Sequence, residues 1–194
     1  NLSANTGSVI SLVPTMLNRL IEKKINTEKL GSFRAIILGG ESAYITLLQR
    51  CLQNNMNIFV SYGMTETCSG ISGYWINEHP DKLESVGAPF KGVCISIVNN
   101  HISIDSKMNM RGYYLEEKLD SSFITSDLGN IKDGFVYIKG RAANITISGG
   151  KKINCDYVKN ILLTHQSIES VLISHKSSLF STILPTIINP PSVV

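Results

Sequence analysis

Phe33-Arg-Ala-Ile-Ile-Leu-Gly-Gly40 is the stretch that decides the fold class. The apolar run is too short for a helix and the glycine pair closes it, so it predicts a buried strand that enters a turn. Upstream, an apolar run over 8–14 ends in proline, and residues 15–24 then carry apolar side chains at helical spacing. Downstream, helical spacing over 43–54 precedes a third apolar run at 57–61. Strands alternating with helices predict an α/β fold with a mostly parallel sheet, covered on both faces.

The pattern changes to antiparallel β structure beyond residue 85. Apolar and polar residues alternate on both sides of Asn99-Asn100, which predicts a hairpin with a two-residue turn. Asp133-Gly134 predicts a second hairpin, between 128–132 and 135–138. The α/β region is therefore expected to be followed by a small antiparallel β region.

A second domain is expected to begin near residue 144. A short strand at 145–147, a Gly149-Gly150 turn, a helix over 155–164 and a strand at 171–174 follow one another there. We therefore expect residues 1–143 to be the C-terminal part of a large domain. Residues 144–194 are expected to be the incomplete beginning of a small α+β domain.

Composition limits the classes of function. The 194 residues are 43% hydrophobic and 17% charged, with a net charge of +3 and no long basic run, which argues for a globular protein and against nucleic-acid binding. No apolar stretch reaches the ~18 residues that a membrane helix needs. Four dispersed cysteines are expected to be reduced thiols, and the four histidines have no metal-ligand spacing.

The segment Ser61-Tyr-Gly-Met-Thr-Glu-Thr67 follows a buried strand, where open α/β sheets bind ligands. Tyr62 offers a flat ring for a base, and Gly63 permits close approach of the backbone. The Thr65 hydroxyl can donate to a phosphate oxygen, and the Glu66 carboxylate can hold a hard cation. The alternative is a plain strand-turn-helix junction in which Thr65 or Thr67 caps a helix.

This segment resembles the Tyr-Gly-x-Thr-Glu motif of the adenylate-forming enzymes, a superfamily that includes the acyl-CoA synthetases. The resemblance implies that Tyr62 stacks on adenine, that Thr65 binds the α-phosphate and that Glu66 helps to hold Mg²⁺. Further residues implied in nucleotide binding are the flanking Ser61 and Gly63 and the glycine loop Gly39, Gly40 and Glu41. Ser85-Val-Gly-Ala-Pro89 and Met110-Arg-Gly-Tyr-Tyr114 resemble the family elements that come next.

Asp127 and Arg141 lie in two further motifs, Phe123-Ile-Thr-Ser-Asp-Leu-Gly129 and Gly134-Phe-Val-Tyr-Ile-Lys-Gly-Arg141. A carboxylate can accept hydrogen bonds from both ribose hydroxyls, and a guanidinium can bridge a hydroxyl and a phosphate. The alternative is a turn residue and a solvated hairpin end. The family places an Asp and an Arg on the ribose at these positions, and it brings the Gly149-Gly150 turn to the coenzyme A tunnel.

The resemblance implies an ATP- and Mg²⁺-dependent acid-CoA ligase that acts through an acyl-adenylate. Ser11-Leu-Val-Pro-Thr-Met-Leu17 and the Ile-Ser-Gly-Gly-x-x-Ile pattern at 147–153 are similar to the o-succinylbenzoate-CoA ligase branch, which implies menaquinone or phylloquinone biosynthesis. Alternatives are a fatty acyl or aryl acyl-CoA ligase, or a truncated nucleotide-binding relative without activity. The expected partners are a small carboxylic acid, ATP and coenzyme A, in the cytoplasm or, if organelle-encoded, the plastid stroma.

The chain also departs from the family pattern. The family's phosphate loop is expected upstream of Asn1 and its catalytic lysine beyond Val194, so the chain is interpreted as a fragment. Ser126 replaces the usual Gly before the ribose Asp, and Asn144 replaces the usual hinge Asp. Asn and Asp share turn preferences, so position 144 is expected to tolerate either residue.

Overall fold

The computed structural model describes residues 8–22, 27–115, 118, 122–148, 151–162, 171–176 and 182–187. The chain divides into two compact units. The first comprises Asn1–Thr125 and Gly129–Ile138, and the second comprises Ser126–Leu128 and Lys139–Val194. The boundary expected at residue 143 stays a prediction. No helix among the described residues is long and apolar enough to cross a membrane.

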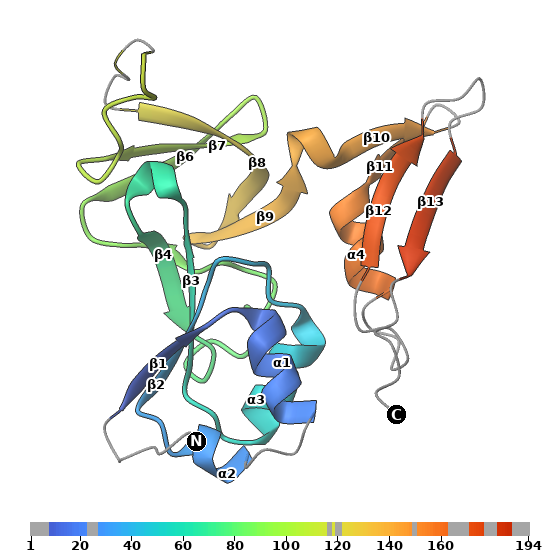
Figure 1. The fold of residues 1–194 in the computed structure, drawn as a ribbon. Coiled ribbons are helices and arrows are strands. Elements are labelled where there is room, and N and C mark those ends of the chain that lie inside the picture. The colour runs from blue at the N-terminus through green and yellow to red at the C-terminus, as the bar shows by residue number, and fades with distance from the viewer. Residues whose placement is uncertain are drawn as a thin grey trace. The chain divides into compact units, whose positions relative to one another are not determined.

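The first unit contains a five-stranded mixed sheet in the order β1-β2-β3-β4-β5 (Figure 1). Strands β1, β2 and β3 are parallel, and β4 and β5 continue the sheet antiparallel. The α/β fold class is thereby confirmed. The elements are β1 (Val9–Leu12), α1 (Pro14–Glu22), α2 (Thr27–Gly31), β2 (Ala35–Leu38), α3 (Ile45–Gln53), β3 (Ile58–Gly63), the short 3₁₀ turn η1 (Thr65–Thr67), β4 (Gly70–Trp75) and β5 (Ala88–Pro89).

Helices α1 and α3 lie on the same face of this sheet (Figure 1). The connections from β1 to β2 and from β2 to β3 step across the sheet in one direction, and right-handed crossovers then place both helices together. Arg50 of α3 donates to the Asn18 side chain of α1 over 3.2 Å, and Leu17 and Leu47 share one buried core. The expectation that helices cover both faces is therefore wrong for the described residues.

A second sheet holds four strands in the order β6-β7-β8-β9. Both predicted turns are confirmed: Asn99 and Asn100 have positive φ between β6 and β7, as do Asp133 and Gly134 between β8 and β9. The strands are β6 (Val93–Val98), β7 (His101–Ser106), β8 (Ser122–Lys132) and β9 (Phe135–Arg141). A second apolar cluster beside them contains Ile71, Ile95, Ile102, Ile104 and Val136.

After the ends of β8 and β9 that belong to it, the second unit contains η2 (Ala142–Asn144) and two small antiparallel pairs. One pair is β10 (Ile145–Ser148) with β11 (Lys151–Asn154), and the other is β12 (Val171–Lys176) with β13 (Thr182–Ile187). Helix α4 (Cys155–Leu162) lies between the pairs in sequence. The predicted turn at 149–150 and the last two residues of the predicted helix lie outside the described residues.

Candidate nucleotide-binding site

Strand β3 delivers the predicted motif to the carboxyl end of the parallel strands. The strand runs two residues further than the sequence predicts, and its pairing with β4 slips between Tyr62 and Gly63. A Cβ at Gly63 would overlap the backbone of Ser69 and Gly70. Only glycine therefore lets the two chain segments meet at this point. The aromatic ring of Tyr62 is half-buried and packs against the second apolar cluster.

The turn that follows β3 is organised by Thr67, which is fully buried. Its Oγ1 accepts a hydrogen bond from the Met64 N–H over 3.1 Å. The same hydroxyl lies 3.0 Å from the Met64 carbonyl and 2.8 Å from the Ser69 carbonyl, and its proton can be donated to either. The buried hydroxyl thus supplies hydrogen-bond partners to the backbone of the turn. Thr65, two residues earlier, is exposed.

Glu66 is held through both its backbone and its side chain. The Met110 N–H donates to the Glu66 carbonyl over 2.7 Å, and the Tyr113 hydroxyl donates to Glu66 Oε1 over 2.8 Å. Each carboxylate oxygen has more than one lone pair, so the group keeps acceptor capacity beyond this bond. A carboxylate in this state is suited to bind a hard cation.

The glycine loop after β2 lies beside this motif. Leu38 pairs with Val60 in the parallel register, so Gly39 and Ser61 follow at neighbouring strand ends. A Cβ at Gly39 would stand 3.2 Å from the Ser61 carbonyl, which is tighter than ordinary packing. Gly40 has φ +81°, a conformation that favours glycine, and Glu41 is exposed. The structure therefore brings Gly39 and Ser61 together, as expected from the carboxyl-end rule.

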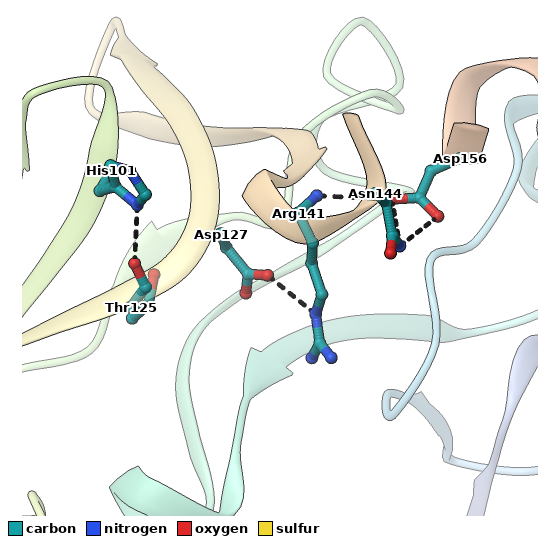
Figure 2. Close-up of polar contacts among 6 residues, drawn as sticks. All are labelled: His101, Thr125, Asp127, Arg141, Asn144 and Asp156. Carbon is teal, nitrogen blue, oxygen red and sulfur yellow. Dashed lines mark hydrogen bonds and ion pairs between the residues drawn. The ribbon is translucent and has the colours of Figure 1, made fainter. Parts of the chain in front are cut away.

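Asp127 and Arg141 belong to the second unit and form an ion pair there (Figure 2). Arg141 Nε donates to Asp127 Oδ1 over 3.1 Å. The Asp127 side chain is 8% exposed, whereas that of Arg141 is 63% exposed. In Figure 2 the two terminal guanidinium nitrogens extend away from Asp127. The pair thus presents a buried carboxylate and an accessible planar cation, a combination suited to hydroxyl and phosphate groups.

Asn144 uses its amide in a way that the sequence does not reveal. Its Nδ2 donates to both carboxylate oxygens of Asp156, over 2.9 and 3.1 Å (Figure 2). The Arg141 N–H also points at Asp156 Oδ2, over 3.4 Å. An aspartate at 144 could not donate and would oppose Asp156 with a like charge. This geometry favours Asn over Asp at position 144, whereas the expectation that Asn144→Asp leaves adenylation little changed stays a prediction.

Helix α4 begins with a side-chain cap. Asn154 Oδ1 accepts from the Asp156 N–H over 2.9 Å and from the Tyr157 N–H over 3.3 Å, while its amide donates to the Lys139 carbonyl. A Cβ at Gly140, where φ is +119°, would collide with the Asn154 side chain. The end of β9 is therefore tied to the start of α4 through the Asn154 side chain.

The remaining expectations concern metals and thiols. Gly149 and Gly150 lie outside the described residues. Among the residues that are described, no three His, Cys, Asp or Glu side chains gather into a metal site. All four cysteines are free thiols: Cys51 is buried, and Cys68 and Cys94 are exposed.

Three contributing residues had no role assigned from the sequence: Thr67, Tyr113 and Asp156. The sequence pattern suggests only a helix cap for Thr67, and it places Tyr113 only within a family element. A threonine two residues after another threonine in a Gly-containing turn is a signal for a turn-stabilising hydroxyl. Nothing local to Tyr113 or Asp156 predicts their partners, because Glu66 lies 47 residues from Tyr113 and Asn144 lies 12 from Asp156.

Comparison with known proteins identifies a family for the first unit. A family model described as AMP-binding enzyme matches residues 2–114, which include the motif at 61–67. The 2-succinylbenzoate–CoA ligase of Lactococcus lactis is 33% identical over 174 residues, covering 85% of this chain and 38% of that protein. The enzyme of the same name from Bacillus subtilis is 32% identical, covering 90% of this chain and 39% of that protein.

Solved structures give the same result for the fold. The o-succinylbenzoate CoA synthetase of Bacillus subtilis, in complex with the acyl-adenylate intermediate OSB-AMP, superposes with a TM-score of 0.80 at 29% identity. The match covers 95% of this chain and 42% of that structure. Its complex with ATP and magnesium ion gives a TM-score of 0.78 at 30% identity, covering 91% and 40%. The chain thus spans about two fifths of the length of the relatives it matches.

Proposed function

Because the chain belongs to the AMP-binding enzyme family, we propose that it is the nucleotide-binding part of a 2-succinylbenzoate–CoA ligase. The observation that carries the proposal is the turn at 61–67, with Glu66 held at the carboxyl end of the parallel strands beside the Gly39-Gly40 loop. The names of the relatives supply the substrate, a dicarboxylic aryl acid. The chain covers 38% of the Lactococcus lactis enzyme, so the proposed activity is that of a longer protein.

The proposed reaction has two steps. A carboxylate oxygen of the acid attacks the α-phosphorus of ATP, the bond from that phosphorus to the bridging oxygen breaks, and pyrophosphate leaves. The coenzyme A thiol, as it loses its proton, then attacks the acyl carbon, a thioester forms and AMP leaves. Both steps need close positioning of the reactants and stabilisation of charge on phosphate oxygens more than they need a covalent protein group.

Each candidate residue receives a role in this proposal. Tyr62 offers its ring to adenine, and Thr65, exposed at the turn, offers a hydroxyl to the α-phosphate. Asp127 and Arg141 serve the ribose. The backbone around Gly39, Gly40, Glu41, Ser61 and Gly63 forms the wall of the nucleotide site, and Gly149-Gly150 is proposed for the coenzyme A tunnel.

A magnesium ion fits the donor set that the chain provides. Mg²⁺ is commonly bound through one or two carboxylates, waters and the phosphates of the substrate rather than by a cage of protein ligands. Glu66 supplies one such carboxylate, and no larger cluster of ligands occurs in the parts of the chain that the structure describes. When bound, the ion would neutralise charge on the phosphates.

The proposed pathway and cellular location rest on the names and origins of the relatives. We propose that the thioester product serves menaquinone biosynthesis and that the enzyme acts in the cytoplasm, which agrees with the bacterial origin of the relatives. The bacterial relatives lend no support to a plastid location or to a role in phylloquinone biosynthesis.

The test uses the complete gene product and ATP–pyrophosphate exchange. With 2-succinylbenzoate we expect exchange well above that with long-chain fatty acids or simple aryl acids, and a CoA thioester detectable by mass spectrometry. Glu66→Gln should lower exchange about 100-fold, because an amide is a poor ligand for Mg²⁺. Glu84→Gln, a change at an exposed glutamate outside the candidate site, is the matched control.

Two outcomes would contradict the proposal. Equal exchange with fatty or aryl acids would assign the enzyme to another acyl-CoA ligase branch, and ATP binding without exchange for any acid would indicate a nucleotide-binding relative.

The 194-residue chain alone should form no thioester, since it covers only two fifths of its relatives. A thioester made by that chain would show that the remaining three fifths are dispensable.

A further inference from the structure

Tyr113 touches the carboxylate to which the proposed function assigns the metal. Its hydroxyl donates to Glu66 Oε1 over 2.8 Å, although the two residues are 47 positions apart. We propose that Tyr113 is a positioning residue that holds the Glu66 carboxylate in the orientation in which it binds Mg²⁺. This inference rests on the proposed function, because it assumes that Glu66 contacts the metal.

The segment that carries Tyr113 forms a second hydrogen bond to Glu66. The Met110 N–H donates to the Glu66 carbonyl over 2.7 Å, so the backbone and the side chain of the glutamate are both fixed by the same segment. Two hydrogen bonds to one residue from positions three apart leave little freedom for the peptide or for the carboxylate. Glu66 lies in an otherwise short turn, where such restraint would not come from secondary structure alone.

The supporting segment is itself internally bonded. The Met108 N–H donates to Ser106 Oγ over 3.1 Å, and the Asn109 N–H donates to the Ser106 carbonyl over 3.1 Å. The Asn109 side-chain amide donates to the Ile104 carbonyl over 2.8 Å, which ties the turn to the buried strand β7. The contact on Glu66 is therefore built on the second sheet and not on a loose loop.

A tyrosine hydroxyl has the chemistry that this position requires. It is a neutral donor, so it orients one carboxylate oxygen and leaves the negative charge of Glu66 available to a cation. A lysine or arginine in its place would compete with the metal for the same charge. A long carboxylate side chain loses rotamer freedom when it is held, and a group already held gives up less on binding a metal.

The neighbouring residue provides a matched control. Tyr113 is 49% exposed and Tyr114 is 92% exposed. The change from tyrosine to phenylalanine removes one oxygen at either position. Only Tyr113→Phe removes a hydrogen bond to Glu66.

The experiment titrates Mg²⁺ in the ATP–pyrophosphate exchange of the complete gene product. Tyr113→Phe should raise the Mg²⁺ concentration for half-maximal rate about three- to tenfold, which corresponds to about 0.7–1.4 kcal/mol, the net contribution of a typical hydrogen bond. The rate at saturating Mg²⁺ should approach that of the unmodified protein. Tyr114→Phe should leave the whole titration unchanged, and both variants should keep the unmodified melting temperature.

Binding of Mn²⁺ to the protein–ATP complex, followed by electron paramagnetic resonance, gives a readout independent of catalysis. Tyr113→Phe should weaken Mn²⁺ binding by a similar factor. In the Glu66→Gln background, Tyr113→Phe should have no further effect on the metal dependence, because the orientation of an absent carboxylate cannot matter.

The outcomes separate this inference from the proposed function. If Glu66→Gln shifts the metal dependence and Tyr113→Phe does not, the positioning role is wrong and the metal role of Glu66 stands. A Tyr113→Phe variant that is slower by the same factor at every Mg²⁺ concentration also overturns positioning. If Glu66→Gln itself leaves the metal dependence unchanged, both the metal assignment and the role of Tyr113 fall.

Discussion

The turn after β3 and the segment that leads into α4 both present residues proposed for the nucleotide, but different forces hold them. In the turn, a fully buried neutral hydroxyl, that of Thr67, satisfies the backbone. In the segment, the contacts are charged: Arg141 with Asp127, and Asn144 with Asp156. Neutral buried hydrogen bonds are insensitive to salt, whereas charged contacts near the surface are screened. The two regions should therefore respond differently to mutation, pH and ionic strength.

The largest stability effect is expected in the turn. Thr67→Val should lower the free energy of unfolding by about 1–3 kcal/mol, because the Met64 N–H loses the fully buried Thr67 hydroxyl as its acceptor. Thr65→Val is the matched control: its hydroxyl is exposed, so stability should change by less than about 0.5 kcal/mol while adenylation falls. Denaturant unfolding and pyrophosphate exchange measure the two effects. Equal stability losses would show that the turn does not depend on the buried hydroxyl.

The apolar core that helix α3 shares with the five-stranded sheet should respond to alkali. Burial raises the pKa of the Cys51 thiol from 9.0 to about 12. Between these values the unfolded chain releases its thiol proton first, so stability is retained below pH 9 and falls as the pH rises toward 12, by up to about 1.4 kcal/mol per pH unit.

Thermal unfolding across that pH window measures this slope. Cys51→Ala should make the slope shallower, although not flat, because burial also raises the pKa of Tyr74 to about 12. Cys94→Ala, at an exposed thiol, should leave the slope unchanged. If the fall in stability with pH is the same in Cys51→Ala as in the unmodified protein, the alkaline sensitivity does not come from the Cys51 thiol.

A smaller effect is expected in the charged segment. Asn144→Asp should destabilise the second unit by about 1 kcal/mol at neutral pH, because two carboxylates would face each other where the amide now donates. The exchanged pair Asn144→Asp with Asp156→Asn should recover most of that loss. Unfolding of the single and double variants in low and high salt gives the coupling. A double variant no better than Asn144→Asp would contradict the pairing.

The smallest effect is expected for the ion pair. A double-mutant cycle with Asp127→Asn and Arg141→Gln should give a coupling of about 0.2–1 kcal/mol without nucleotide, since the arginine is largely exposed. The coupling should fall when NaCl rises from about 0.05 M to about 0.5 M. A coupling energy that does not change with NaCl concentration would mean that the Asp127–Arg141 pair is more deeply buried than the exposed Arg141 side chain indicates.

The features predicted correctly are those set by neighbouring residues. The apolar runs at 33–38 and 57–61 are strands, the helical spacing at 43–54 is a helix, and the Asn-Asn and Asp-Gly turns close hairpins. Strand β4 was not predicted, because Gly70 and Gly73 lower the strand propensity of Gly70–Trp75. Glycine is favoured at position 73 because a Cβ there would stand only 2.6 Å from the Phe59 ring and 2.7 Å from the Val60 carbonyl oxygen.

The sequence by itself determined the family, the alternation of strands and helices up to residue 61, and the residue types in the nucleotide motifs. These follow from short-range spacing and from motif chemistry, which the linear chain records directly. Only the tertiary structure decided that Tyr113 donates to Glu66 and that Asn144 donates to Asp156. It also placed helices α1 and α3 on one face of the sheet. The Tyr113–Glu66 contact joins residues 47 positions apart, which no local propensity encodes, and the handedness of the strand crossovers sets the placement of the two helices.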